Sequence, residues 1–314
     1  MSNVKQVGII GGGSIGVSFA IIFSRDAESV RIYEPNVQRR EVIDSELIDK
    51  ATALEPISGI SAQDLVKKIS ITASLKDAVS EAGLIQECVP EKVSLKREIF
   101  QQISGFISSD AVIASSSSAI PASESAEGLK IEQQVLVAHP GNPPHLLPVI
   151  EIVPSPKTRP EIVQAAVDFY GSVGMKPVQL KKEIEGFLFN RLQGAMLREA
   201  YALVRDDIAD VDDIDTVVRE GLGKRWAFMG PFEVADLNTR GGIKSHAEKL
   251  GPTYQRQGAE RGQYDPWTPD LVEKVEQQRR ALLPLDEWEQ RVQWRDEQLL
   301  KNLKAEAQHG GGQS

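Results

Sequence analysis

The feature that most constrains the fold is a glycine-rich turn close to the N-terminus. Gly11, Gly13 and Gly16 stand at the fixed positions of a G-x-G-x-x-G pattern. An apolar run at residues 7–10 precedes this turn, and the apolar segment at residues 17–23 has the length and composition of a helix. The first glycine permits the turn, the second lets the backbone approach a pyrophosphate, and the third lets the helix pack against the strand. This pattern predicts a strand, a tight turn and a helix in succession.

Short β-rich runs alternate with longer polar, helix-forming stretches through the first half of the chain. This alternation is typical of α/β proteins with a parallel, doubly wound sheet. After Lys182 the strand-like runs disappear and apolar residues recur at helical spacing. We predict a Rossmann-like domain over residues 1–182, an all-helical domain over 183–305 and a disordered tail over 306–314. The expected strands are residues 7–10, 29–33, 69–72, 83–86, 111–114, 135–138, 149–153 and 176–180.

Glu34 supports a nucleotide-binding role for the glycine-rich turn. It ends the second expected strand, 18 residues after Gly16, where a carboxylate can accept hydrogen bonds from ribose hydroxyls. A carboxylate here would repel a 2′-phosphate, so the pattern favours NAD over NADP. Arg39 and Arg40 follow shortly and could hold such a phosphate, although a solvated helical face is the preferred interpretation of both.

Composition narrows the class of protein and its partners. A chain of 314 residues can hold two domains and a large core. A net charge of −9 argues against nucleic acid or an anionic membrane as the main partner. No apolar run approaches the roughly 20 residues of a membrane span, and no signal peptide is apparent, so we expect a cytoplasmic protein. Cys88 is the single cysteine, which we expect to be buried, and the scattered histidines form no metal-ligand set.

Polar residues at three successive strand positions suggest acid–base chemistry. The serine run 115–118 closes an apolar segment, His139 follows the strand 135–138, and Glu151 lies inside the next strand. A histidine and a carboxylate so placed are the parts of a His–carboxylate pair, in which imidazole is a good general base near neutral pH. A structural histidine and a solvated glutamate are the alternatives. The Pro- and Asn-rich turn after His139 favours catalysis.

With these pieces in place, the chain resembles the L-3-hydroxyacyl-CoA dehydrogenase superfamily, and within it the branch of lambda-crystallin and L-gulonate 3-dehydrogenase. The resemblance covers nearly the whole chain. The motifs are GGGSIG at 11–16, QECVPEKVSLK at 86–96, ASSSSAI at 114–120, AHPGNPP at 138–144, PVIEIVP at 148–154, GFLFNRLQ at 186–193 and GLGKRWAFMGPFE at 221–233.

The resemblance implies a role for each residue that matches these motifs. His139 would take the hydroxyl proton as hydride leaves for the nicotinamide, and Glu151 would orient the imidazolium. Ser118 would hold the substrate oxygen, and Asn190 would hydrogen-bond near that oxygen, unless it merely cross-links helices. The other matched positions would contact NAD: Ser14 and Ile15 through the backbone, Glu91 and Lys96 near the nicotinamide ribose, and Asn142 beside the nicotinamide or the substrate.

Charge and the resemblance together suggest a substrate class. Residues 41–56, where the resemblance places CoA-contacting helices, carry five carboxylates and a single lysine, which disfavours CoA phosphates. A small polar L-3-hydroxy acid similar to L-gulonate fits better, with Arg225 and Trp226 as its expected carboxylate pocket. An acyl-CoA ester, a carnitine-type hydroxy acid and a non-catalytic NAD-binding or structural protein remain alternatives. The resemblance also implies a homodimer.

Overall fold

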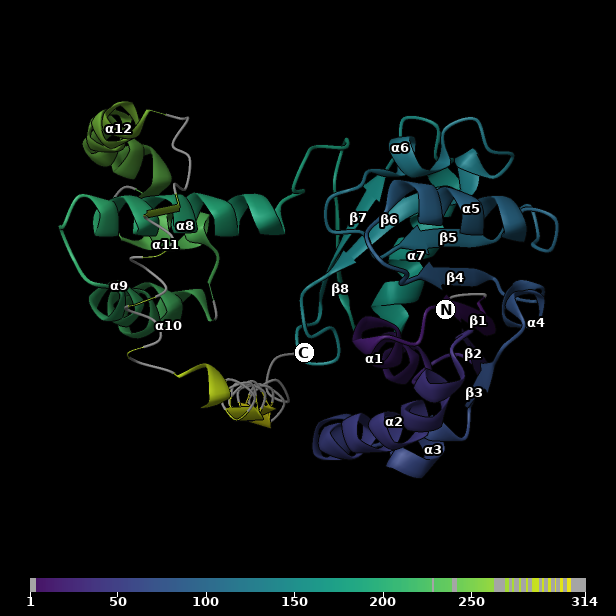
Figure 1. Cartoon of the computed structure of the whole chain (residues 1–314). Helices are drawn as coiled ribbons and strands as arrows, with labels where there is room; N and C mark the ends of the chain where they lie inside the picture. The colour runs from purple at the N-terminus through teal and green to yellow at the C-terminus, as the bar shows by residue number, and fades with distance from the viewer. Residues whose placement is uncertain are drawn as a thin grey trace. The chain divides into compact units, whose positions relative to one another are not determined.

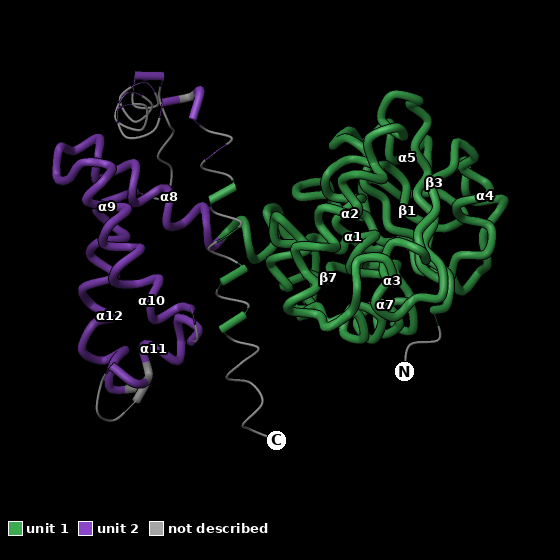
Figure 2. Tube along the Cα trace, turned by 90° about the horizontal axis from the view of Figure 1, so that it is seen from below, with its two compact units in different colours: residues 1–191, 293–314 green, residues 192–292 purple. Residues whose placement is uncertain are grey.

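The chain forms two compact units. The computed structural model describes residues 4–227, 229–238 and 242–262, with scattered positions between 269 and 305. Residues 1–191 with 293–314 form one unit, called here the sheet unit, and residues 192–292 form the other, the helical unit (Figure 2). The predicted tail, 306–314, and most of the expected helix at 271–283 lie outside the described residues.

The eight strands within the described residues form one sheet, in the order β3-β2-β1-β4-β5-β6-β7-β8 (Figure 1). This order confirms the predicted Rossmann-like architecture. The strands are β1 (Gln6–Ile10), β2 (Ser29–Tyr33), β3 (Ile69–Thr72), β4 (Leu84–Glu87), β5 (Val112–Ser115), β6 (Val135–Pro140), β7 (Val149–Pro154) and β8 (Lys176–Gln179).

One strand departs from the all-parallel sheet expected from the sequence. β7 pairs antiparallel with β6, whereas every other neighbouring pair is parallel. The reason is the short connection 141–148, which contains no crossover helix. A parallel neighbour requires a long crossover, so this loop can only reverse the chain.

Helices surround the sheet, and both faces of the sheet are buried. In the sheet unit they are α1 (Ser14–Phe23), α2 (Val37–Ser58), α3 (Ala62–Val66), α4 (Leu75–Val79), α5 (Val93–Ile103), α6 (Ala122–Ala126) and α7 (Pro160–Ser172). The neighbouring residues Ile9 and Ile10 are both fully buried but belong to different apolar clusters. Successive side chains of a strand point to opposite faces, so each face has its own core.

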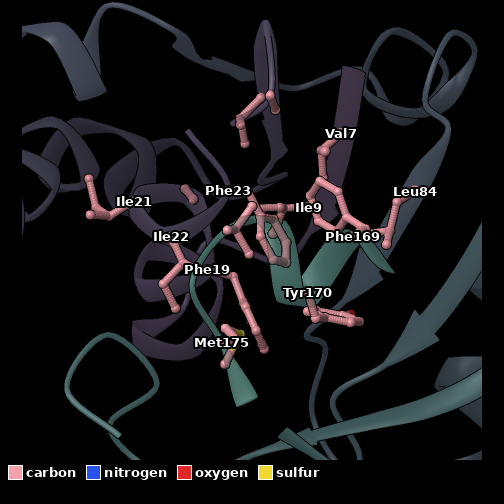
Figure 3. Close-up of a cluster of buried hydrophobic side chains, with 14 of the residues drawn as sticks. Val7, Ile9, Phe19, Ile21, Ile22, Phe23, Leu84, Phe169, Tyr170 and Met175 are labelled. Atoms are coloured by element: carbon pink, nitrogen blue, oxygen red, sulfur yellow. The ribbon is translucent and has the colours of Figure 1, made fainter. Parts of the chain in front are cut away.

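The larger core cluster joins α1 to α7. Phe19 and Phe23 of α1 stack with ring centroids 5.1 Å apart, and Phe23 meets Phe169 of α7 edge-on, also at 5.1 Å (Figure 3). Tyr170 is fully buried beside them. Because the packing of this aromatic cluster fixes α1, it also fixes the glycine-rich turn that precedes α1.

The helical unit contains most of α8 (Phe189–Arg205), then α9 (Val211–Val217), a π-helical turn (Val218–Leu222), α10 (Gly223–Trp226), α11 (Pro231–Leu237) and α12 (Gly242–Arg261). Arg261 ties α12 to α8 through Glu199 at 3.0 Å and Asp206 at 2.7 Å. None of the helices among the described residues has the length and apolarity to cross a membrane. The predicted cytoplasmic location stays a prediction.

Candidate active site

The glycine-rich turn has the shape of a pyrophosphate cradle. Gly11 has φ 109°, and a Cβ atom on it would lie 2.8 Å from the Cys88 carbonyl oxygen. A Cβ on Gly16 would lie 2.0 Å from the Gly11 carbonyl oxygen. A Cβ on Gly13, by contrast, would meet no atom within 4 Å. The turn is therefore closed on the protein side and open in front of the α1 N-terminus, where N–H groups favour an anion. These residues fit a dinucleotide.

Glu34 is held rigidly at the end of β2. Its Oε2 accepts from the Gly12 N–H at 3.0 Å, and its Oε1 accepts from the Asn36 N–H at 2.9 Å. A carboxylate has about four lone-pair sites, so two such bonds leave room for the hydroxyls of a ribose. The Glu34 carboxylate is thus already oriented to accept hydrogen bonds from a ribose, as the sequence predicted for this position.

The two arginines after β2 are engaged within the protein. Arg39 donates to the Gly12 carbonyl at 2.7 Å and to both oxygens of Glu46, which raises the pKa of the guanidinium and lowers that of the Glu46 carboxyl. Arg40 donates to the carbonyl of Glu34 at 2.7 Å. The solvated face expected from the sequence is therefore wrong in detail, because both side chains brace the turn. The guanidinium of Arg39 is thereby engaged by Gly12 and Glu46, which leaves little of it to hold a 2′-phosphate.

His139 and Glu151 lie opposite each other in the antiparallel pair β6–β7. The imidazole Nδ1 is 2.7 Å from Glu151 Oε2, and both side chains are buried. Oε1 of the same carboxylate accepts from the N–H groups of Leu188 at 2.6 Å and Phe189 at 3.0 Å. An ionised carboxylate only accepts hydrogen bonds, so the neutral imidazole carries its proton on Nδ1. The lone pair then lies on Nε2, the nitrogen that can act as a base.

Two phenylalanines surround the His139 ring. The ring centroid of Phe187 lies 5.6 Å from that of His139, and the Phe189 ring lies edge-on at 6.3 Å. Phe187 is fully buried and has φ 48°, a left-handed conformation that is costly for a bulky residue. This turn directs the ring of Phe187 toward His139 and the next two N–H groups toward Glu151. Strain of this kind concentrates at functional sites.

Ser118 and Asn190 are brought together, although they are far apart in the sequence. The Asn190 amide donates to the Ser118 carbonyl at 3.0 Å. Glu91 organises the same serine turn, since its Oε1 accepts from the Ser117 hydroxyl at 2.6 Å and the Ser118 N–H at 2.9 Å. Partial burial would raise the pKa of Glu91, but these bonds and the charge of Lys96 outweigh it and hold the pKa below its usual value.

Behind this turn lies a buried charge network that sequence reasoning missed. Lys96, expected close to the ribose, is 1% exposed, and its ammonium contacts both oxygens of Glu87 at 2.9 Å. The same ammonium lies 3.4 Å from Glu91 Oε2. Ser115 donates to Glu87 at 2.5 Å. The signal was present in the sequence, because Glu87 is a charged residue at the end of an apolar strand and is followed nine positions later by a lysine.

The loop 141–148 contains Asn142 and His145. Asn142 is exposed, whereas His145 is buried with Nδ1 3.1 Å from the Ser18 hydroxyl. That hydroxyl also donates to the Ser14 carbonyl at 2.8 Å, so His145 fastens the loop to α1. Arg225 and Trp226, the expected carboxylate pocket, belong to the helical unit. Arg225 donates there to the side chain of Asn238 at 3.2 Å.

Comparisons with known proteins identify the family to which the chain is similar. The NAD-binding domain of 3-hydroxyacyl-CoA dehydrogenase matches residues 6–184, and the C-terminal domain of the same family matches residues 186–282. Lambda-crystallin of Oryctolagus cuniculus is 36% identical over 308 residues, which cover 96% of each chain. L-Carnitine dehydrogenase of Oceanobacillus iheyensis is 34% identical over 281 residues, which cover 87% of this chain and 88% of that one.

A solved structure extends the likeness to the whole fold. The chain matches 5-formyl-3-hydroxy-2-methylpyridine 4-carboxylic acid 5-dehydrogenase, an NAD+ dependent dismutase, with a TM-score of 0.81 and 28% identity, covering 95% of this chain and 97% of that one. The resemblance found in the sequence is thereby confirmed. The protein belongs to the 3-hydroxyacyl-CoA dehydrogenase family and is an NAD-dependent oxidoreductase.

Proposed function

We propose that the protein oxidises the 3-hydroxyl group of a small polar L-3-hydroxy acid similar to L-gulonate. The observation that carries this proposal is the buried His139–Glu151 pair, with its 2.7 Å contact between Nδ1 and Oε2. NAD, when bound, supplies the hydride acceptor at the nicotinamide C4. The chain must then supply the base that removes the hydroxyl proton, and Nε2 of His139 is that base.

Glu151 prepares the imidazole for this proton transfer. Its carboxylate is fixed by the N–H groups of Leu188 and Phe189, at 2.6 Å and 3.0 Å, so the Nδ1–H group of His139 meets an acceptor that cannot rotate away. When Nε2 takes the proton, the imidazolium lies beside an ionised carboxylate. A charge-assisted hydrogen bond of this kind is about twice as strong as a neutral one. The rings of Phe187 and Phe189 reduce the access of water to the pair.

Ser118 and Asn190 are the proposed partners of the reacting oxygen. Donors aimed at this oxygen would stabilise the carbonyl as it forms. The hydrogen bond from Asn190 to the Ser118 carbonyl, at 3.0 Å, fixes the two residues relative to each other. Glu91 fixes the serine turn from behind and is supported by Lys96. We propose that Asn142 and this turn border the nicotinamide.

The proposed substrate class is supported by charge. Glu41, Asp44 and Asp49 are exposed on α2, where they would repel the phosphates of CoA. The relatives cover both possibilities, since L-carnitine dehydrogenase and a 3-hydroxyacyl-CoA dehydrogenase of Gibberella moniliformis are each 34% identical to this chain. Arg225, with its planar fork, is the proposed ligand of the substrate carboxylate, beside Trp226. Arg225→Met should raise KM for free acids; an unchanged KM for each acid would remove this assignment.

NADH production on four substrates tests the proposal. These are L-gulonate, L-carnitine, L-3-hydroxybutyrate and L-3-hydroxybutyryl-CoA, each with a His139→Gln control. Turnover of a free acid that disappears in the control supports both the pair and the substrate class. Turnover of the CoA ester alone would show that the substrate is an acyl-CoA ester and would refute the proposed substrate class. NADH binding without any turnover would favour a non-catalytic role.

We further propose that the protein is a homodimer that associates through the helical unit. Large apolar side chains are exposed there, including Leu192 at 66%, Val217 at 63% and Phe232 at 82%. Exposed apolar surface of this kind marks an interaction site. Sedimentation velocity at micromolar concentration should show a dimer, and a monomer alone would refute the proposal.

A further inference from the structure

A cavity in the sheet unit lies apart from the residues assigned to catalysis. Its volume is 260 Å³, and it is bordered by the ends of α1 and α2, the loop 141–148 and the start of β8. A water molecule takes up about 30 Å³ of the liquid, so the cavity has room for a molecule of several heavy atoms. Much of its wall is apolar: Ile22, Leu54, Ile57, Leu146 and Met175.

The polar part of the lining is entirely cationic or neutral. Among the residues that the structure describes, Arg25, Lys176 and His145 line the cavity, and no carboxylate does. This arrangement is unusual in a protein that has 45 acidic residues against 36 basic ones. Buried cations are normally paired with an anion, because desolvation otherwise disfavours the charge. Lys176 is exposed, but Arg25 is half-buried, and the described lining holds no anion to balance its charge.

Arg25 is the lining residue whose hydrogen-bonding groups are least satisfied. Its Nη1 reaches the Val173 carbonyl at 3.4 Å, a long contact. Its Nε–H is buried and has no acceptor within the described part of the chain. Burial also lowers the pKa of this guanidinium, as expected for a charge that is poorly compensated. The free edge of a guanidinium, formed by Nε and one terminal nitrogen, matches the two oxygens of a carboxylate.

We propose that this cavity binds a small carboxylate with a short apolar chain. The carboxylate lies on Arg25 and Lys176, and the chain lies along Leu54, Ile57 and Met175. The assignment uses no residue of the proposed catalytic set. It therefore stands or falls separately from the proposed reaction. His145 lines the cavity and also holds the loop 141–148 against α1 through Ser18. A bound carboxylate would therefore contact the side chain that fixes this loop.

Methionine labelling provides a direct test, with hexanoate as the probe. The chain has four methionines, of which Met175 is 4% exposed and lines the cavity, whereas Met196 lies on α8. In enzyme labelled at the methionine methyl carbons, hexanoate should shift the Met175 signal and leave that of Met196 in place. The signal that disappears in the Met175→Leu variant is the signal of Met175. Hexanamide, which has the same chain without the charge, should produce no shift.

Calorimetric titration of hexanoate then tests the cations. Arg25→Met should weaken binding by about tenfold or more, since it removes a charge-assisted pair. Lys176→Met, on the exposed side, should weaken it severalfold. Lys249→Met, an exposed lysine of the helical unit, is the matched control and should bind hexanoate as the parent does. NADH binding by fluorescence verifies that each variant is folded.

Three results would count against the proposal. One is a Met175 signal that stays fixed at hexanoate concentrations well above a roughly millimolar Kd. Another is an equal shift with hexanamide, which would show that the cavity recognises apolar bulk and not charge. Retained affinity in both Arg25→Met and Lys176→Met would also refute the assigned position of the carboxylate.

Discussion

The buried charge network behind the serine turn gives the sharpest prediction about stability. Lys96 is 1% exposed and contacts Glu87, which is fully buried, at 2.9 Å through both oxygens. Lys96→Met preserves most of the side-chain volume but leaves the Glu87 carboxylate with only the Ser115 hydroxyl and the Val89 N–H. Removal of one partner from a buried pair costs about 3–5 kcal/mol. That is a large part of a typical total stability of roughly 5–15 kcal/mol.

The reverse substitution should cost less. In Glu87→Gln the ammonium of Lys96 keeps Glu91 as a second carboxylate, 3.4 Å away. Loss of one charged hydrogen-bond partner then costs about 1.5–3 kcal/mol. The double variant removes both charges, so its cost should fall clearly below the sum of the two single costs. The structure therefore predicts an order of effects as well as their size.

Urea unfolding followed by circular dichroism measures these differences. Circular dichroism is preferred to tryptophan fluorescence, because residues 1–191, which contain the charge network, have no tryptophan. Lys157→Met is the matched control, since Lys157 pairs with Glu132 at 2.9 Å but is 57% exposed. The control should change stability far less than Lys96→Met does, because solvent screens an exposed pair. The reasoning is refuted if Lys96→Met costs no more than Lys157→Met, or less than Glu87→Gln.

Three further outcomes follow from the site. Gly11→Ala should lower Tm, because a Cβ there would lie 2.8 Å from the Cys88 carbonyl oxygen. A Cβ on Gly13 would meet no atom, so Gly13→Ala should fold normally but weaken NADH binding in a fluorescence titration. Glu151→Gln should lower kcat by about a hundredfold, with a smaller effect on NADH affinity, because imidazole loses its orienting carboxylate; equal kcat would contradict the proposed mechanism. Cys88 is half-buried and not fully buried as expected from the sequence, but desolvation still raises the pKa of its thiol to about 12, so the thiol stays protonated below that pH. Iodoacetamide at pH 8 should therefore label Cys88 more slowly in folded than in unfolded protein, and equal labelling rates would contradict this.

Much of the fold was predictable because its signals are local. Each expected strand appears within one or two residues of its predicted position, since buried strands need apolar runs and the runs are short and bounded. The glycine-rich turn was predictable for the same reason, because close approach at Gly11 and Gly16 leaves no room for a side chain. His139 and Glu151 were suggested as a pair by the strands that carry them, and the structure places them in register.

What the sequence alone could not determine depends on contacts between distant segments. The two backbone donors to Glu151 come from residues 37 and 38 positions further along the chain, whereas the direction of β7 could have been predicted from the short loop 141–148. The place of Lys96 near the nicotinamide ribose stays a prediction, and its contacts with Glu87 and Glu91 come from tertiary packing. The spacing of apolar residues along a helix or strand reveals which of its faces is buried, because this spacing is set by residues close together in the sequence. Which charge lies opposite a buried charge is decided only when the chain has folded.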